Sequence, residues 1–502
     1  GMAFVAMANE LLDYPMQRRF HEDPLVASAE LLLQERPPRH VPVEPPHIDE
    51  VEMVRSVREL PEPTQRSYPL AETPVPATHF LSNGRYAVMV TNAGGGYSRF
   101  GDMAVTRYRE DITRDCWGQF FYIRDLATGK VWSAAFQPTL EPYDDYHVTF
   151  LADKAEIRRR DGDLETYTEV LVSPEDDVEI RRVTLTNHGR TPLELEVTSF
   201  FEVALTPQSA DQSHRAFSNL FVETEVLPNC EALLFTRRPR SAEETRWWGM
   251  HVVACEGGGE SACSFETDRA TFVGRLRSPL SPAALAEPGG LMGTHGPVLD
   301  PCCAIRRVVR IAPGERARLA FATGAANCRE TVVGYAEKYR DIRNAQRAAD
   351  LAWTSSKIEL RDLGLSPEDA VTFMRLSSRL LLTDPFSRLK ATPPVENGLP
   401  LSGLWGLGIS GDLPIMLVKI ERLEDTPLVR QMLLAHQYWR HKGLIVDLVV
   451  LNTKPSGYSS ELTERLRLLL RTGHALQLAD KPGGVFLRNA DQIHPDVLVL
   501  LE

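Results

Sequence analysis

The chain has 502 residues, of which 43% are hydrophobic and 25% are charged, and its formal net charge is −12. This length predicts two or three globular domains, and a negative chain with only short basic clusters excludes nucleic acid as a partner. Seven cysteines without a C-x-x-C pair exclude a zinc site and a disulfide framework. The sequence contains no run of about 18 apolar residues, so no membrane-spanning segment is predicted.

The first 40 residues favour helices followed by a linker. Residues 3–12 place apolar side chains on one helical face, and residues 23–36 begin with Asp23 as N-cap and Pro24 at the first helical position. The next segment, RPPRHVPVEPPH, is so rich in proline that an extended linker is expected over residues 41–74.

Residues 80–324 change to short alternating segments such as RYAVMVT, EIRRVTLT and IRRVVRI, separated by turns such as SNG, NHG and APGE. Strands with no helices between them can bury their apolar faces only against another sheet. The sequence therefore predicts a large antiparallel sandwich, assigned to residues 75–328.

Helical periodicity returns after the sandwich. Residues 329–356 predict one long helix, and residues 366–382 predict another with Ser366 as N-cap and Pro367 at the first helical position. Together they form a predicted helical connector over residues 329–385.

Residues 386–502 are predicted to begin a helical domain. One helix is expected over residues 426–443, after a Thr-Pro cap and before Gly443, and another over about 459–478. The final DQIHPDVLVLLE favours the start of a further helix, so this helical layer is expected to be incomplete.

Four long motifs stand out: LSNGRYAVMVTNAGGGYSRFGDMAVTRYREDITRDCWGQF, SPEDDVEIRRVTLTN, FETDRATFVGR and GLWGLGISGDLPIMLVKI. In this order they resemble glycoside hydrolase family 94, and most of all the phosphorylase-like module of bacterial cyclic β-1,2-glucan synthases. The resemblance runs from about residue 75 to the end. Residues 1–40 are similar to the last helices of the glucoamylase-like module that precedes it in those synthases.

The resemblance implies a β plus α multidomain fold with a large antiparallel β-supersandwich of the galactose-mutarotase type, a helical connector and an (α/α)6 barrel. Only the beginning of that barrel is expected in residues 386–502. The implied reaction splits or forms a β-glucosidic bond with inversion, and one carboxylic acid protonates the leaving oxygen while phosphate attacks. Phosphate would be a co-substrate, and neither a cofactor nor a metal is implied.

The catalytic acid of the family lies in an Asp-Asp-hydrophobic-hydrophobic-Trp context, which this sequence lacks. Its two Asp-Asp pairs, Asp144-Asp145 and Asp176-Asp177, lie in the strand-rich half and favour turns or strand edges. No catalytic residue is therefore predicted here, and the chain is interpreted as a truncated piece that is inactive alone.

The segment SGLWGLGISGDLPIMLVKI places one carboxylate, Asp412, among glycines. The resemblance implies that Asp412 holds hydroxyls of a glucosyl unit, with Ser410, Gly411 and Trp405 beside the sugar. Two alternatives remain open: Asp412 caps a helix that begins at Leu413, and Trp405 belongs to a core.

A second group of candidates lies in GGGYSRFGDMAVTRYRED and just after it. In family dimers part of the sandwich reaches the active site of the partner, which makes Tyr97, Arg107 and Arg114 candidate substrate contacts. Each arginine, including Arg99 and Arg109, is alternatively a surface ion pair. Outside this segment, His436 is predicted to be a packed or partly exposed histidine, and Cys302 and Cys303 receive no role.

Three functions are compatible with these patterns. The leading hypothesis is a glucan-acting piece of a cyclic β-1,2-glucan synthase that binds β-glucan, as a homodimer or together with the remainder of the synthase. The alternatives are a carbohydrate-binding or assembly subunit completed by a separately encoded remainder, and a free-standing β-glucan phosphorylase. A cytoplasmic location is expected, with the parent synthase at the inner membrane.

Overall fold

The computed structural model describes residues 2–22, 65–228, 231–241, 243–258, 263–382, 397–454, 461–471 and 474–501. The chain divides into two units, Gly1–Glu62 and Pro63–Glu502. The first unit contains α1 (Met2–Leu11) and α2 (Pro15–His21), so the helix predicted over residues 3–12 is confirmed. The helix predicted over residues 23–36 and the proline-rich segment lie outside the described residues.

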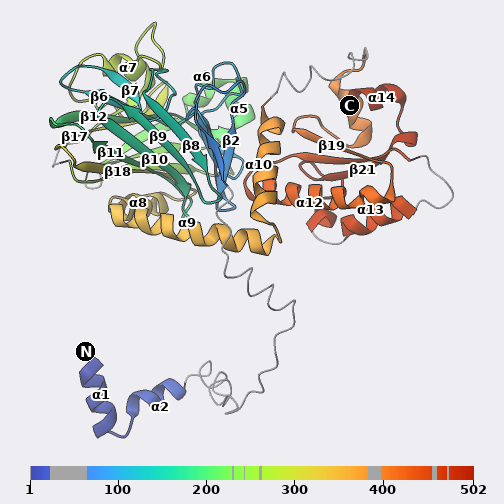
Figure 1. Cartoon of the computed structure of the whole chain (residues 1–502), viewed down its shortest axis with the longest axis horizontal. Coiled ribbons are helices and arrows are strands. Elements are labelled where there is room, and N and C mark those ends of the chain that lie inside the picture. Colours follow the sequence, from blue (N-terminus) through green and yellow to red (C-terminus); the bar gives the residue numbers. More distant parts are fainter. Residues whose placement is uncertain are drawn as a thin grey trace. The chain divides into compact units, whose positions relative to one another are not determined.

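Two antiparallel sheets form the sandwich, as the alternating pattern predicts (Figure 1). The first has the order β1-β8-β9-β10-β11-β18-β15-β14-β13. Its strands are β1 (Arg66–Tyr68), β8 (Asp145–Phe150), β9 (Lys154–Asp161), β10 (Leu164–Val172), β11 (Val178–Asn187), β13 (Val222–Leu227), β14 (Ala232–Arg237), β15 (Trp247–Glu256) and β18 (Arg316–Ala326).

The second sheet has the order β16-β17-β12-β5-β4-β3-β2, and β6 and β7 extend it beside β12. Its strands are β2 (Thr78–Ser82), β3 (Tyr86–Thr91), β4 (Gly96–Phe100), β5 (Met103–Thr106), β6 (Phe120–Asp125), β7 (Val131–Ser133), β12 (Leu193–Pro207), β16 (Ser264–Asp268) and β17 (Pro301–Ile311). The short helices α5 (Gln208–Ser213), α6 (Arg215–Asn219), α7 (Arg269–Val273) and η2 (Ala283–Leu285) lie in its connections. The main core, with Val88, Phe201 and Phe321, fills the space between the sheets.

The outer face of the first sheet is also apolar and is covered by the connector. Val332 and Ala336 of α8 (Arg329–Tyr339) and Ala348 of α9 (Ile342–Asp362) pack there against a second core cluster of strand residues. Figure 1 shows both helices running along this face of the sandwich.

One detail of the predicted connector is wrong. Residues 329–356 do not form a single helix, because α8 ends at Tyr339 and Asp341 starts α9 by accepting a hydrogen bond from the N–H of Arg343 at 3.0 Å. The next helix, α10 (Pro367–Leu381), confirms the prediction, since Ser366 and Asp369 form a reciprocal capping box at its start.

The C-terminal part combines helices with a parallel sheet, β19-β20-β21. The strands are β19 (Ile415–Ile420), β20 (Asp447–Asn452) and β21 (Val485–Asn489), and the helical elements are η3 (Leu401–Leu407), η4 (Leu423–Asp425), α12 (Thr426–His441), α13 (Glu461–Arg471), η5 (His474–Leu478), η6 (Ala490–Gln492) and α14 (Pro495–Leu501). One face of this sheet packs against α10, α12 and α13, and the other against η3 and α14.

The helices predicted within residues 426–443 and in the final residues are confirmed, and α13 with η5 occupies most of 459–478. The prediction of helices alone is wrong for the three strands, because IMLVKI, DLVVLN and VFLRN are short apolar runs that form a sheet between two layers of helices, with β20 buried along its whole length. The beginning of an (α/α)6 barrel is not confirmed by this arrangement.

Asp412 caps no helix, so that alternative is wrong. The chain enters β19 three residues later, and the carbonyl of Pro414 accepts the N–H of Asp447 at 2.9 Å, which starts the parallel ladder. The segment after Asp412 is thus a strand of a sheet, and it has no helix N-terminus that Asp412 could cap.

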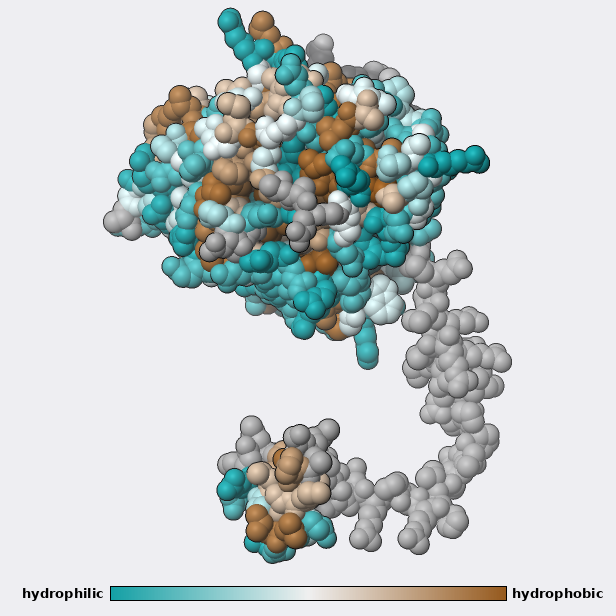
Figure 2. Space-filling view, turned by 90° about the vertical axis from the view of Figure 1, so that its left-hand side faces the viewer, coloured by the Kyte–Doolittle hydropathy of each residue, from teal (hydrophilic) through white to brown (hydrophobic). Residues whose placement is uncertain are grey.

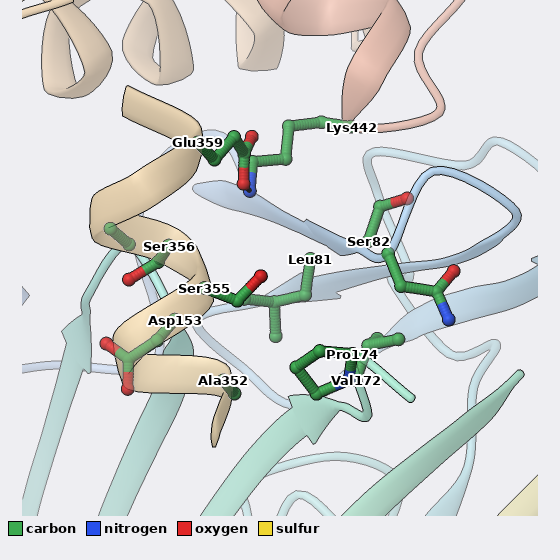
Figure 3. A pocket seen from close by; sticks show the side chains of 12 residues that line it. Leu81, Ser82, Asp153, Val172, Pro174, Ala352, Ser355, Ser356, Glu359 and Lys442 are labelled. Carbon is green, nitrogen blue, oxygen red and sulfur yellow. Dashed lines mark hydrogen bonds and ion pairs between the residues drawn. The ribbon is translucent and has the colours of Figure 1, made fainter. Parts of the chain in front are cut away.

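The C-terminal part is joined to the sandwich and the connector by Lys442, directly after α12. Its ammonium lies 2.8 Å from Oε2 of Glu359 on α9, and only 3% of the Lys442 side chain is exposed. Figure 3 shows this pair at one end of a small pocket that Ser82, Asp153 and Ser356 also line. The adjacent Gly443 has φ +81° and touches β3, since an added Cβ would lie 2.5 Å from the Ala87 Cβ.

Replacing Lys442 by methionine should destabilise this joint. The substitution leaves the largely buried Glu359 carboxylate without its lysine partner and with only the more distant imidazole of His441 nearby. Such a loss costs about 3–5 kcal/mol of unfolding free energy. Urea denaturation followed by tryptophan fluorescence measures it. The pair Lys442→Met with Glu359→Met should recover most of the loss, and Lys357→Met on the exposed side of α9 is the control. An unchanged urea midpoint for Lys442→Met would contradict this role.

The contrast between Asp412 and Ser366 gives a second test of the fold. Asp412→Asn should leave the free energy of unfolding within about 0.5 kcal/mol of the unsubstituted protein, because the residue is exposed and caps nothing. Ser366→Ala should cost about 1 kcal/mol, because it removes a capping hydrogen bond. Equal losses in urea titrations would mean that Asp412 does support a helix start.

Candidate functional site

The predicted sugar-binding segment is an exposed loop between η3 and β19. Trp405 is 67% exposed, and its indole N–H donates to the carbonyl of Ser410 at 3.3 Å. Gly411 has φ +80°, and an added Cβ would lie 2.6 Å from Leu401, so only glycine fits this turn. Trp405 therefore belongs to the surface and not to a core, and its indole remains available to a ligand.

Asp412 is exposed next to this turn, and its backbone N–H donates to the hydroxyl of Ser410 at 3.2 Å. A buried carboxyl, Asp447, lies near it at the start of β20 and accepts the N–H of Gly483 at 2.6 Å. Burial raises the pKa of Asp447, and the negative charge of Asp412 raises it further. The loop thus presents an indole, a hydroxyl and a carboxylate, which are groups that can bind a sugar.

The candidates on the sandwich are less accessible. Tyr97 is 5% exposed, its ring centroid lies 5.1 Å from that of Tyr108, and the guanidinium of Arg99 lies 5.9 Å from its ring. Burial raises the pKa of the Tyr97 hydroxyl. Tyr97 belongs to the core that the sandwich shares with the C-terminal part.

Arg107 is buried in a network of ion pairs. Its Nε lies 3.0 Å from Oδ2 of Asp211, its Nη1 donates to Glu202 at 2.9 Å, and its Nη2 donates to Asn219 at 2.7 Å. The hydrogen bonds with Asp211 and the charge of Glu202 outweigh burial and raise the pKa of Arg107. These contacts fasten α5 and α6 to the sheet, so the position of Arg107 favours a structural role.

Carboxylates and arginines extend this network. Arg215 lies 3.0 Å from Glu202 and 2.9 Å from Asp300, and Arg269 also contacts both acids. Arg109 donates to the carbonyl of Asp211 at 3.2 Å. Because each of these arginines already contacts at least one of the acids, the network is not a ready site for phosphate.

Arg114 is exposed and lines a cavity of about 530 Å³ in the sandwich. The cavity is formed by residues 71–76, Asn92 and Ala93 after β3, the loop between β5 and β6, the segment after β7, and Ser278–Leu280. None of its lining residues comes from the loop of Asp412, so the two predicted groups of candidates do not meet in this cavity.

The same cavity contains Asp115, which was not among the predicted residues. The hydroxyl of Thr91 donates to Asp115 Oδ2 at 2.6 Å, and burial raises the pKa of this carboxyl to about 7. Asp115 has φ +43°, an uncommon conformation for a residue other than glycine. The sequence shows only an acid after Arg114 in TRDCWG, and neither burial nor φ can be read from that pattern.

The remaining polar candidates have structural positions. His436 is buried, its Nε2 lies 3.0 Å from the carbonyl of Val446, and burial lowers its pKa, so the prediction of a packed histidine is confirmed. Cys302 and Cys303 are buried in β17, where burial raises both thiol pKa values.

The two Asp-Asp pairs lie at strand edges and turns, as predicted. Asp144 precedes β8 and accepts the N–H of Gly162 at 2.6 Å, whereas Asp176 accepts the hydroxyl of Tyr339 at 2.7 Å. Within the described ranges, His, Cys, Asp and Glu side chains do not form groups of three or more suited to a metal ion. None of the described helices has the length and apolar character needed to span a membrane.

Comparisons with known proteins agree with the motifs. The family model described as glycosyl hydrolase 94, supersandwich domain, matches residues 61–342, which is more than half of the chain. Over 502 residues the chain is 36% identical to the cyclic beta-(1,2)-glucan synthase NdvB of Rhizobium meliloti (strain 1021), covering 99% of this chain and 18% of that protein.

More distant relatives match a smaller part. The chain is 23% identical over 301 residues to the N,N'-diacetylchitobiose phosphorylase of Vibrio furnissii, which covers 57% of this chain and 34% of that enzyme. A solved bacterial glucoamylase complexed with acarbose covers 64% of this chain and 44% of its own, at 8% identity and a TM-score of 0.36. This chain therefore spans less than a fifth of NdvB and about a third of the phosphorylase. By its motifs and by the family match, the chain belongs to the glycosyl hydrolase 94 supersandwich family.

Proposed function

We propose that this chain is a β-glucan-binding, phosphorylase-like part of a larger protein of the cyclic β-1,2-glucan synthase type. The observation that carries this proposal is the 36% identity to NdvB over 99% of the chain, which includes the C-terminal part as well as the sandwich. The family model alone ends at residue 342. The similarity to NdvB continues beyond residue 342. It therefore favours a function like that of NdvB, and not only a function common to all proteins with this sandwich.

The exposed loop of Trp405, Ser410, Gly411 and Asp412 is the proposed contact with a glucosyl unit. Its indole can cover an apolar face of the sugar, and the carboxylate can accept two hydroxyl hydrogens. Arg107 is not part of this proposal, because its guanidinium is held by Glu202 and Asp211. Phosphate is proposed as a co-substrate of the larger protein and not of this chain alone.

A second proposal concerns assembly. Helices α1 and α2 and the turn between them expose several large apolar side chains, namely Phe4, Met7, Leu11, Leu12 and Phe20. Figure 2 shows brown, hydrophobic surface on this unit. Clustered exposed apolar residues are typical of contact surfaces. They favour association with another part of the larger protein or with a second copy of the chain. The described cysteines are all free, which is compatible with the cytoplasmic location that we propose.

Calorimetric titration with linear and cyclic β-1,2-glucan tests the binding function, with a maltooligosaccharide as comparator. We expect selective binding of the β-1,2-glucans. Asp412→Asn should weaken it roughly tenfold or more, because a hydrogen bond to a charged group is lost. Asp425→Asn, an exposed acid in η4, is the control of equal charge and should change little.

Incubation of the purified chain with β-1,2-glucan and inorganic phosphate tests the expected inactivity. We expect no glucose 1-phosphate, because the sequence lacks the family's context for the catalytic acid. Release of glucose 1-phosphate would contradict the inactivity. Failure to bind any β-glucan would contradict the proposed function itself.

A further inference from the structure

The cavity around Asp115 is distinct from the loop of Asp412 and has the features of a ligand site. Its volume of about 530 Å³ lies in the range of small-molecule pockets. Five separate segments of the sandwich form it, among them the loop between β5 and β6 and the segment that follows β7. Asp115 is one of the residues that line the cavity, and it is partly buried.

The Asp115 side chain is fixed in one direction. Thr91 donates its hydroxyl to Asp115 Oδ2 and accepts the N–H of Gly95 at 2.9 Å. Gly95 lies directly against the carboxyl, since an added Cβ would be 2.3 Å from Oδ1. The left-handed backbone of Asp115 is maintained at some cost, and such strain is frequent where a side chain is aimed at a ligand.

The carboxyl of Asp115 has no cation to stabilise its charge. Among the described residues, no lysine, arginine or histidine lies within ion-pair distance of it, although Arg114 is adjacent in the chain. Burial therefore dominates, and its pKa of about 7 means that the neutral acid is well populated at physiological pH. A neutral carboxyl donates one hydrogen bond and accepts another, as a sugar hydroxyl does.

The rest of the lining fits a neutral sugar better than an ion. The amide of Gln137 donates to the carbonyl of Arg114 at 2.7 Å, which holds the Asp115 loop against the segment after β7. Phe136, Leu140 and Leu280 add apolar surface, and both leucines are partly exposed. A pyranose ring combines apolar CH faces with hydroxyl edges, so it matches both kinds of lining.

We propose that this cavity of the sandwich binds one glycosyl unit of a β-glucan, with a hydrogen bond between the carboxyl of Asp115 and a ring hydroxyl. The proposal rests on the proposed function for the identity of the ligand. It adds a second binding site, on the sandwich, to the one proposed at Asp412. A glucan that contacts both sites would bind more tightly than at either site alone, because the second contact forms within the complex at a high effective concentration.

Binding should then depend on pH. Below pH 7 the carboxyl is protonated and able to donate, and above pH 7 it must first take up a proton, so the dissociation constant should rise up to tenfold per pH unit. The titratable and charged groups that face Asp115 from the surrounding elements are Glu72, Tyr108, Asp111, Arg114, Cys116 and Tyr146. Burial raises the pKa values of Cys116, Tyr108 and Tyr146, so Asp115 is the group expected to titrate near pH 7.

Cys116 gives a local readout because it lines the same cavity. The rate of its alkylation by iodoacetamide, followed by peptide mass spectrometry, would be measured with and without a linear β-1,2-glucan at each pH from 6 to 9. We expect the glucan to slow alkylation of Cys116 severalfold at pH 6–7 and much less at pH 9. The partly buried thiol of Cys328, outside the cavity, is the internal control and should be unaffected.

Asp115→Asn is the decisive variant, because asparagine tolerates a positive φ and its amide donates a hydrogen bond at every pH. In Asp115→Asn we expect the glucan to slow Cys116 alkylation equally at every pH. In Asp115→Ala the glucan should no longer slow it. Asp102→Asn, an exposed acid in the turn between β4 and β5, is the charge-matched control and should behave as the unsubstituted protein.

Two results would overturn the proposal: glucan binding with no change in Cys116 alkylation, or the same pH profile for Asp115→Asn and the unsubstituted protein. In both cases the proposed function stands, because calorimetry still records binding. Absence of calorimetric binding at every pH instead rejects the proposed function. If Asp115→Asn does not fold, the pH profile of Cys116 protection in the unsubstituted protein still decides.

Discussion

The structure depends on burial of both faces of the nine-stranded sheet that runs from β1 to β13. One face packs on the second sheet and the other on α8 and α9, and each interface has its own apolar cluster. A sheet with two apolar faces cannot stay in water, so the connector helices are as necessary to the sandwich as its second sheet. The connector then directs α10 and the C-terminal part to the edge formed by β2, β3 and β4.

Several buried polar contacts hold the C-terminal part in place. Ser378 of α10 bonds Thr78 of β2, the indole of Trp439 donates to the carbonyl of Phe373 at 2.9 Å, and Lys442 pairs with Glu359. These contacts require matched partners, since a buried polar group without one is costly. The C-terminal part is therefore held in a specific position against the sandwich, with the loop of Asp412 left exposed.

The two candidate binding regions differ in physical character. The loop of Asp412 carries an exposed acidic side chain, whereas Asp115 lines a cavity of about 530 Å³ and burial raises the pKa of its carboxyl. An exposed loop can contact many sugars weakly, and a cavity selects by shape. The proposed binding of a long glucan uses both.

Much of the fold followed from local patterns. Alternating strands predicted the sandwich, and Ser366 with Pro367 predicted the start of α10, because both signals act over a few residues. The sequence did not predict the break between α8 and α9 at Asp341. An aspartate within a helical pattern can lie inside one helix or cap the next, and only the structure shows that Asp341 caps α9. The strands β19, β20 and β21 were missed because short apolar runs do not distinguish a buried strand from a buried helix.

The candidate site was only partly predictable. The motifs pointed to Asp412 and Trp405, and the structure leaves both accessible, but Arg107 and Tyr97 proved to be buried among partners that lie far away in the chain. Asp115 could not have been selected, because its pKa depends on groups brought together from distant segments.

The sequence by itself determined the family, the sandwich and the position of most helices, since these depend on periodicity and on long motifs. Only the tertiary structure decided which charged side chains are free and which are matched by one another. That decision rests on burial and on distances between segments far apart in the chain, and no local pattern encodes either.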